Sequence, residues 1–108
     1  MDSNSNEIMS MTIIANSSEC RSRVFDALRL VRDNKDYEGA KKLLDEADKY
    51  SLQAHIVQTD LLVKQSNGEG VDIDVLLVHA QDHLMTTMIA QELVTEIVEF
   101  FRPNNTYK

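Results

Sequence analysis

The chain has 108 residues, 43% hydrophobic and 27% charged, which predicts one globular domain and excludes a disordered chain. Its formal net charge of -7 excludes the basic surface of a nucleic-acid-binding protein and favours a partner with a positive docking face. A single cysteine, Cys20, excludes an internal disulfide and fits a reducing compartment, so we expect a cytoplasmic protein. The N-terminus lacks a signal-peptide pattern, and no segment approaches the ~20 apolar residues that span a membrane.

The first predicted helix runs from about Glu7 to Arg32, after a polar start at residues 1–6 that we expect to be disordered. Gaps of three and four residues predict one buried face, formed by Ile13, Ser17, Cys20, Val24, Ala27 and Val31. The polar run at 33–36 ends this helix, and Asp36 is placed to cap the next one.

The second predicted helix runs from Tyr37 to about Gln65 and has a heptad-like stripe of Ala40, Leu43, Ala47, Tyr50, Ala54, Val57 and Leu61. This spacing indicates a left-handed, nearly antiparallel bundle. A loop is expected at residues 66–70, after which Asp74 caps a third helix that ends before Pro103. We therefore predict an all-α, antiparallel three-helix bundle over residues 7–102, with a C-terminal tail at 103–108.

The third helix, from Asp74 to Phe101, carries a face of mixed character when it is wound at about 100° per residue. That face comprises Val75, Leu76, His79, His83, Thr86, Ala90, Leu93 and Ile97, with Asp82 at its edge. Its ends are aliphatic, while its middle holds two imidazoles and a hydroxyl. Burying polar groups is unfavourable unless each finds a partner, so we interpret this as a packing face that contains a functional site.

The apolar residues of the three helices exceed what a single bundle of this size can cover. Large exposed apolar patches mark interfaces, so we expect a homo-oligomer with the third helix near the symmetry axis.

The histidines His79 and His83 lie one helical turn apart, so that their rings share one side of the helix. Three interpretations remain open from this spacing alone. The pair could ligate a metal, although the acid stands in the wrong place for a His-Glu-x-x-His motif. One neutral imidazole could accept a phosphoryl group as a nucleophile. Finally, both rings could be core histidines bonded to Thr86 and Gln81.

The run from His79 to Thr87, HAQDHLMTT, closely resembles the signature of lactose/cellobiose-type enzyme IIA components of the bacterial sugar phosphotransferase system. Weaker similarities occur in the same order as in that family, at Arg21-Ser22, Ala54 to Thr59, and Gly68 to Gly70. The resemblance extends from Met11 to Phe101 and favours the cellobiose/diacetylchitobiose branch. Ser18 stands where a glycine is expected, a departure that should alter helix packing and not the chemistry.

The resemblance implies a homotrimer of nine helices in which His79 takes a phosphoryl group from HPr through Nε2 and passes it to a IIB component. This relay would serve uptake of a β-linked disaccharide of the cellobiose, chitobiose or lactose type, with membrane contact only through the IIC permease. Gln81 and His83 would support the phosphate oxygens. Asp82 from three chains would share one divalent cation, expected to be Mg²⁺, because three adjacent carboxylates cannot all stay ionised alone.

Two rival functions are carried alongside the relay. In the first, His79, Asp82 and His83 of one chain bind a transition metal in a helical metalloprotein. In the second, the protein is an oligomeric adaptor with inert histidines. We expect His55 to be a structural histidine bonded across helices, and Arg21 is left unassigned.

Overall fold

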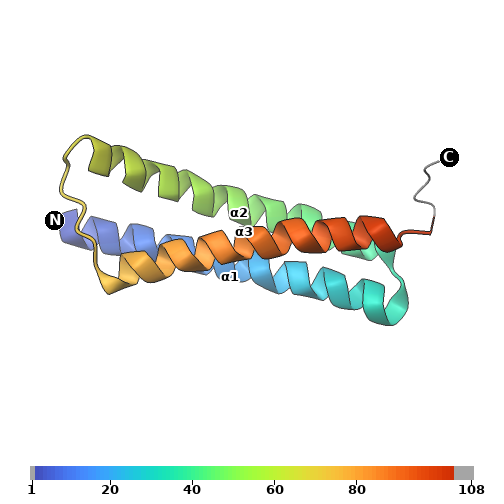
Figure 1. Ribbon diagram of the computed structural model, residues 1–108. Helices are drawn as coiled ribbons and strands as arrows, with labels where there is room; N and C mark the ends of the chain where they lie inside the picture. The colour runs from blue at the N-terminus through green and yellow to red at the C-terminus, as the bar shows by residue number, and fades with distance from the viewer. Residues whose placement is uncertain (1, 104–108) are drawn as a thin grey trace.

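The computed structural model describes residues 2–103, so Met1 and most of the predicted C-terminal tail lie outside the described residues. Within that range the chain forms three helices and no strand: α1 (Asp2–Asn34), α2 (Tyr37–Ser66) and α3 (Val75–Phe101). The helices lie side by side, with α2 antiparallel to both α1 and α3 (Figure 1). This confirms the predicted all-α, three-helix bundle. In the described range, each helix is too short or too polar to cross a membrane.

The ends of the helices follow their local chemistry. The carboxylates of Asp36 and Asp74 accept the backbone N–H three residues further on, at 2.9 and 2.8 Å, so both predicted N-caps are confirmed. At the other end of α3, Arg102 has an extended backbone, as expected for a residue that precedes a proline. Pro103 therefore ends the helix where the sequence indicates.

The start of α1 differs from the sequence-based expectation. Residues 1–6 are predicted to be disordered, whereas the helix begins at Asp2. The side chain of Asn6 donates a hydrogen bond to the carbonyl of Gly70 at 2.9 Å and accepts one from Lys64 at 3.1 Å. The amide thus joins the start of α1 to the end of α2 and to the loop between α2 and α3. Residue type alone does not predict this long-range contact.

The core confirms the stripe predicted for α1, because all six of its residues are at most 7% exposed. On α2 the buried residues are Ala40, Leu44, Ala47, Ala54, Gln58 and Leu61. Leu43, Tyr50 and Val57 of the predicted stripe are only partly buried, so α2 is turned slightly towards the neighbouring positions. The amide of Gln58 is thereby brought into the interior.

The side of α3 that packs in the bundle is not the predicted one. The face that α3 turns towards α1 and α2, here called the inner stripe, consists of Ala80, Leu84, Thr87, Gln91, Val94 and Val98. The predicted packing face lies about 100° from the inner stripe around the helix axis, which corresponds to a shift of one residue. On that face Val75 is 85% exposed and His79 is also exposed. The prediction is wrong because α3 is apolar on several sides, so its periodicity alone does not select one.

The opposite side of α3, here called the outward stripe, is largely apolar and uncovered. Its members recur at gaps of three and four: Val78, Asp82, Met85, Ile89, Leu93, Ile97 and Phe100. The apolar members are 37–73% exposed. Exposed apolar stripes of this kind are typical of protein–protein interfaces.

Candidate functional site

The histidine pair lies on α3 between the inner and outward stripes, on the side that faces α1. The ring centroids of His79 and His83 are 6.0 Å apart, with the planes tilted by 47°. His79 is exposed, whereas His83 is half-buried. The i, i+4 spacing of the helix brings the rings together, and packing against α1 makes their environments different.

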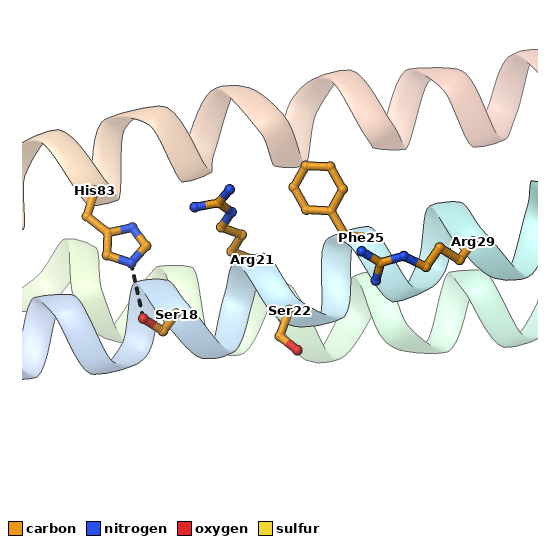
Figure 2. Close-up of a pocket in the computed structure, with 6 residues that line it drawn as sticks. All are labelled: Ser18, Arg21, Ser22, Phe25, Arg29 and His83. Atoms are coloured by element: carbon orange, nitrogen blue, oxygen red, sulfur yellow. Dashed lines mark hydrogen bonds between the residues drawn. The ribbon is translucent and has the colours of Figure 1, made fainter.

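His83 is held by hydroxyl groups at both ring nitrogens. Ser18 Oγ on α1 lies 3.1 Å from Nε2 (Figure 2), and Thr87 Oγ1 lies 3.3 Å from Nδ1. A neutral imidazole has one donor and one acceptor, and each hydroxyl can serve in either role. The two contacts therefore fix the orientation of the ring and suit either tautomer.

Ser18 corrects an expectation drawn from the sequence. Its side chain was expected to affect only helix packing, but its hydroxyl bonds directly to the half-buried histidine. In the sequence, this role is signalled only by a serine at a position where a glycine is expected. That substitution does not identify His83, 65 positions away, as the partner.

Gln81 is not brought to His79 within the chain, since two residues of helix separate them by about 200°. Its Oε1 instead accepts a hydrogen bond from Gln58 Nε2 of α2 at 2.5 Å. Thr86 donates to the backbone carbonyl of Asp82 at 2.9 Å, one turn earlier. The interpretation that Gln81 and Thr86 satisfy two core histidines is therefore wrong.

Asp82 is exposed in the outward stripe, four residues after Val78 and three before Met85. Within residues 2–103, no three His, Cys, Asp or Glu side chains gather closely enough to ligate a metal. His79, Asp82 and His83 are therefore not gathered into a single-chain metal site in this structure.

His55 is exposed on α2. In the described part of the chain its side chain makes no hydrogen bond across the helices, so its expected structural role is wrong. Its backbone carbonyl accepts the hydroxyl of Thr59 at 3.0 Å, within the same helix.

Beside His83 lies an open depression between α1 and α3, about 450 Å³ in volume. Figure 2 shows the side chains that line it: Ser18, Arg21, Ser22, Phe25, Arg29 and His83. The previously unassigned Arg21 extends towards α3 between His83 and Phe25. The lining thus combines two guanidinium groups, two hydroxyls and an imidazole.

Comparison with known proteins identifies the family of this chain. The model of the family described as "PTS system, Lactose/Cellobiose specific IIA subunit" matches residues 8–102. The N,N'-diacetylchitobiose-specific EIIA component of Escherichia coli (strain K12) is 42% identical over 90 residues, which cover 82% of this chain and 76% of that protein.

Two solved structures share the fold. PtcA from S. mutans aligns with a TM-score of 0.90 at 39% identity, covering 94% of this chain and 99% of that one. The IIA(chitobiose)–HPr complex of the Escherichia coli phosphotransferase system aligns with a TM-score of 0.75 at 37% identity, covering 88% and 91%. The chain therefore belongs to the lactose/cellobiose-specific IIA subunits, which are phosphotransferase relay components of the sugar phosphotransferase system.

Proposed function

We propose that this protein is a cytoplasmic phosphocarrier that takes a phosphoryl group from HPr on His79 and passes it to a IIB component. The relay serves uptake and phosphorylation of a β-linked disaccharide of the cellobiose, chitobiose or lactose type. The observation that carries the proposal is the exposed ring of His79 beside a second histidine that is held at both nitrogens. The ring of His79 is accessible to a protein partner, and the ring of His83 beside it is held in a fixed orientation.

The transfer is a nucleophilic displacement at phosphorus. Nε2 of neutral His79 attacks the phosphoryl group carried by HPr, so a new N–P bond forms. The bond between phosphorus and the donor atom of HPr breaks, and its electron pair stays on that donor atom. Passage to IIB repeats these steps with the roles exchanged. Such transfer depends mainly on positioning and charge stabilisation. His83 supports the phosphoryl oxygens by turning a ring N–H from its hydroxyl partner to the phosphoryl group, whereas Gln81 holds α2 through Gln58.

The partners follow from charge and from the relatives. A net charge of -7 favours a partner with a positive docking face. A relative with 37% identity has been solved in complex with HPr, which supports HPr as the donor here. IIB is the acceptor, and the membrane is reached only through the IIC permease.

The outward stripe of α3 supports a homotrimer of nine helices. Three stripes around a threefold axis would cover apolar side chains that are otherwise 37–73% exposed. Asp82 lies within this stripe, so three carboxylates would meet at the axis. Their mutual repulsion is relieved by one divalent cation such as Mg²⁺, which prefers oxygen ligands.

The relay is tested by intact mass of the protein after incubation with phosphoenolpyruvate, enzyme I and HPr. We expect one acid-labile phosphoryl adduct on the wild type and none on a folded His79→Ala variant. His55→Ala is the matched control, because it removes another exposed histidine and should leave the adduct in place. A wild type that folds but acquires no adduct would refute the relay.

The cation is tested through Asp82→Asn, which removes the charge and keeps the shape. Sedimentation of the wild type should show trimers that loosen when EDTA removes the cation, while the variant remains trimeric with or without EDTA. Identical behaviour of both proteins towards EDTA would refute a shared cation at this position.

A further inference from the structure

We propose that the depression beside His83 is an oxyanion site in which Arg21 holds the phosphoryl group as it arrives at and leaves the relay histidine. This inference rests on the proposed function and adds a positioning residue to it. Its ligand is a tetrahedral oxyanion, which reaches the site either tethered to His79 or as free inorganic phosphate.

The first argument is the availability of the Arg21 guanidinium. Among the described arginines, Arg21 is the one that contacts no carboxylate; the others are Arg23, Arg29, Arg32 and Arg102. This occurs in a chain with 18 acidic and 11 basic residues, in which an exposed arginine readily finds an acid. Its guanidinium instead lies over the ring of Phe25, 5.8 Å from the centroid. A cation–π contact of this kind uses up no N–H donor, so the donors remain available for an anion.

The second argument is the composition of the lining. Among the described residues, none that lines this depression is acidic. Ser18 and Ser22 add hydroxyl donors, and Arg29 adds a second guanidinium, although Asp26 already binds that group at 3.0 Å. The described lining therefore offers cationic and hydroxyl groups, a composition that suits phosphate oxygens, which accept charge-assisted hydrogen bonds.

The third argument is position. Arg21 also lines a smaller depression with Thr86 and Thr87 of α3, so its side chain lies along that helix directly after His83. Along α3, His83 lies between Arg21 and His79. The ring centroids of His79 and His83 are 6.0 Å apart. Arg21 thus lies beyond His83 on the α1 side of the relay histidine. In the proposed transfer the phosphoryl group leans towards α1 over the ring of His83, and the guanidinium neutralises its charge without a covalent step.

The test is single-turnover transfer from phosphorylated HPr, measured over a range of HPr concentrations. For Arg21→Gln we expect the saturating rate constant to fall at least about tenfold, as when a preorganised donor is lost, with little change in the half-saturating concentration. Arg32→Gln is the matched control: it removes the same charge from the same helix, and its partner Asp33 lies outside the depression. Arg21→Lys should recover part of the rate, since it keeps the charge and loses the planar fork.

Three results would overturn the proposal. Arg21→Gln could transfer as fast as Arg32→Gln. It could raise only the half-saturating concentration, which would make Arg21 a docking residue for HPr. It could shift sedimentation towards smaller species, which would mean that Arg21 pairs with a carboxylate of a neighbouring copy.

A second arm distinguishes the source of the oxyanion and does not need the relay to work. The Nε–Hε NMR signal of Arg21 is followed while inorganic phosphate is added, and again after phosphorylation by HPr. Movement only after phosphorylation assigns the site to the tethered group, and movement in both cases assigns it to either source. A signal that moves in neither case refutes the oxyanion site, even if His79 is phosphorylated normally.

Discussion

The inner and outward stripes of α3 belong to one helix, yet they differ in size of side chain and in what covers them. The inner stripe is dominated by small or β-branched residues, and its buried members are at most 4% exposed. The outward stripe carries larger apolar side chains that remain 37–73% exposed. Small side chains let helices approach closely, so the bundle is built on the less hydrophobic stripe. Hydrophobicity alone therefore does not identify the face that packs within the chain.

The largest effect is expected from a charge in the outward stripe. Ile89→Asp would place three carboxylates within an apolar contact, so the proposed trimer should dissociate completely while the helical circular dichroism is retained. Sedimentation velocity measures this. Leu52→Asp, at a residue that is 56% exposed on α2, is the matched control and should leave the oligomer unchanged. If both variants behave alike, the outward stripe is not the interface.

Truncation within the inner stripe should affect the protomer itself. Leu84 is fully buried, so Leu84→Ala should lower the free energy of unfolding by about 2–5 kcal/mol through lost burial and a cavity. Urea unfolding in the monomeric Ile89→Asp background isolates this effect from assembly. Leu93→Ala, on the exposed outward stripe, should change the monomer by less than about 0.5 kcal/mol. Equal losses would abolish the distinction between the two faces.

The reactivity of Cys20 tests the packing of the inner stripe of α3, because its Sγ lies 3.7 Å from Gln91 in that stripe. Burial, with a contribution from the carboxylate of Asp48, raises the pKa of the thiol from 9.0 to about 11. At pH 8 this lowers the thiolate fraction about hundredfold, so alkylation by iodoacetamide should be at least that much slower than in urea.

The same pKa shift makes stability depend on pH. The folded chain holds the thiol proton more tightly than the unfolded chain, so this contribution is complete below pH 9 and is lost as the pH rises towards 11. Cys20→Ala should remove that part of the alkaline loss. If Cys20 is alkylated as fast in the native protein as in urea, α3 does not shield its thiol from solvent.

The smallest effect is expected at two neighbouring serines. Ser17 is fully buried, and in the described part of the chain its hydroxyl has no hydrogen-bond partner. Ser17→Ala should therefore raise the free energy of unfolding by about 1 kcal/mol. Ser18→Ala removes an exposed hydroxyl bonded to His83 and should change stability by less than about 0.5 kcal/mol. Urea unfolding of both variants compares the buried face of α1, which holds Ser17, with its exposed face, which holds Ser18. Effects of equal sign and size would contradict this difference between the two faces.

Much of this protein is determined by local sequence. Both N-caps, the end of α3 before Pro103 and the buried stripe of α1 follow from residue type and spacing, since each involves neighbours within one or two helical turns. The HAQDHLMTT run also predicted the family, because a motif within one helix can be read directly from the order of residues.

The rotation of α3 and the contacts of its polar residues were decided only by the tertiary structure. Ser18 meets His83 across 65 positions, Gln81 meets Gln58 across 23, and Arg21 of α1 lines a depression together with His83 of α3. Such contacts depend on how each helix turns about its own axis. That turn is set by the close packing of small residues against two other helices at once, and the periodicity of a single helix that is apolar on several sides does not contain it.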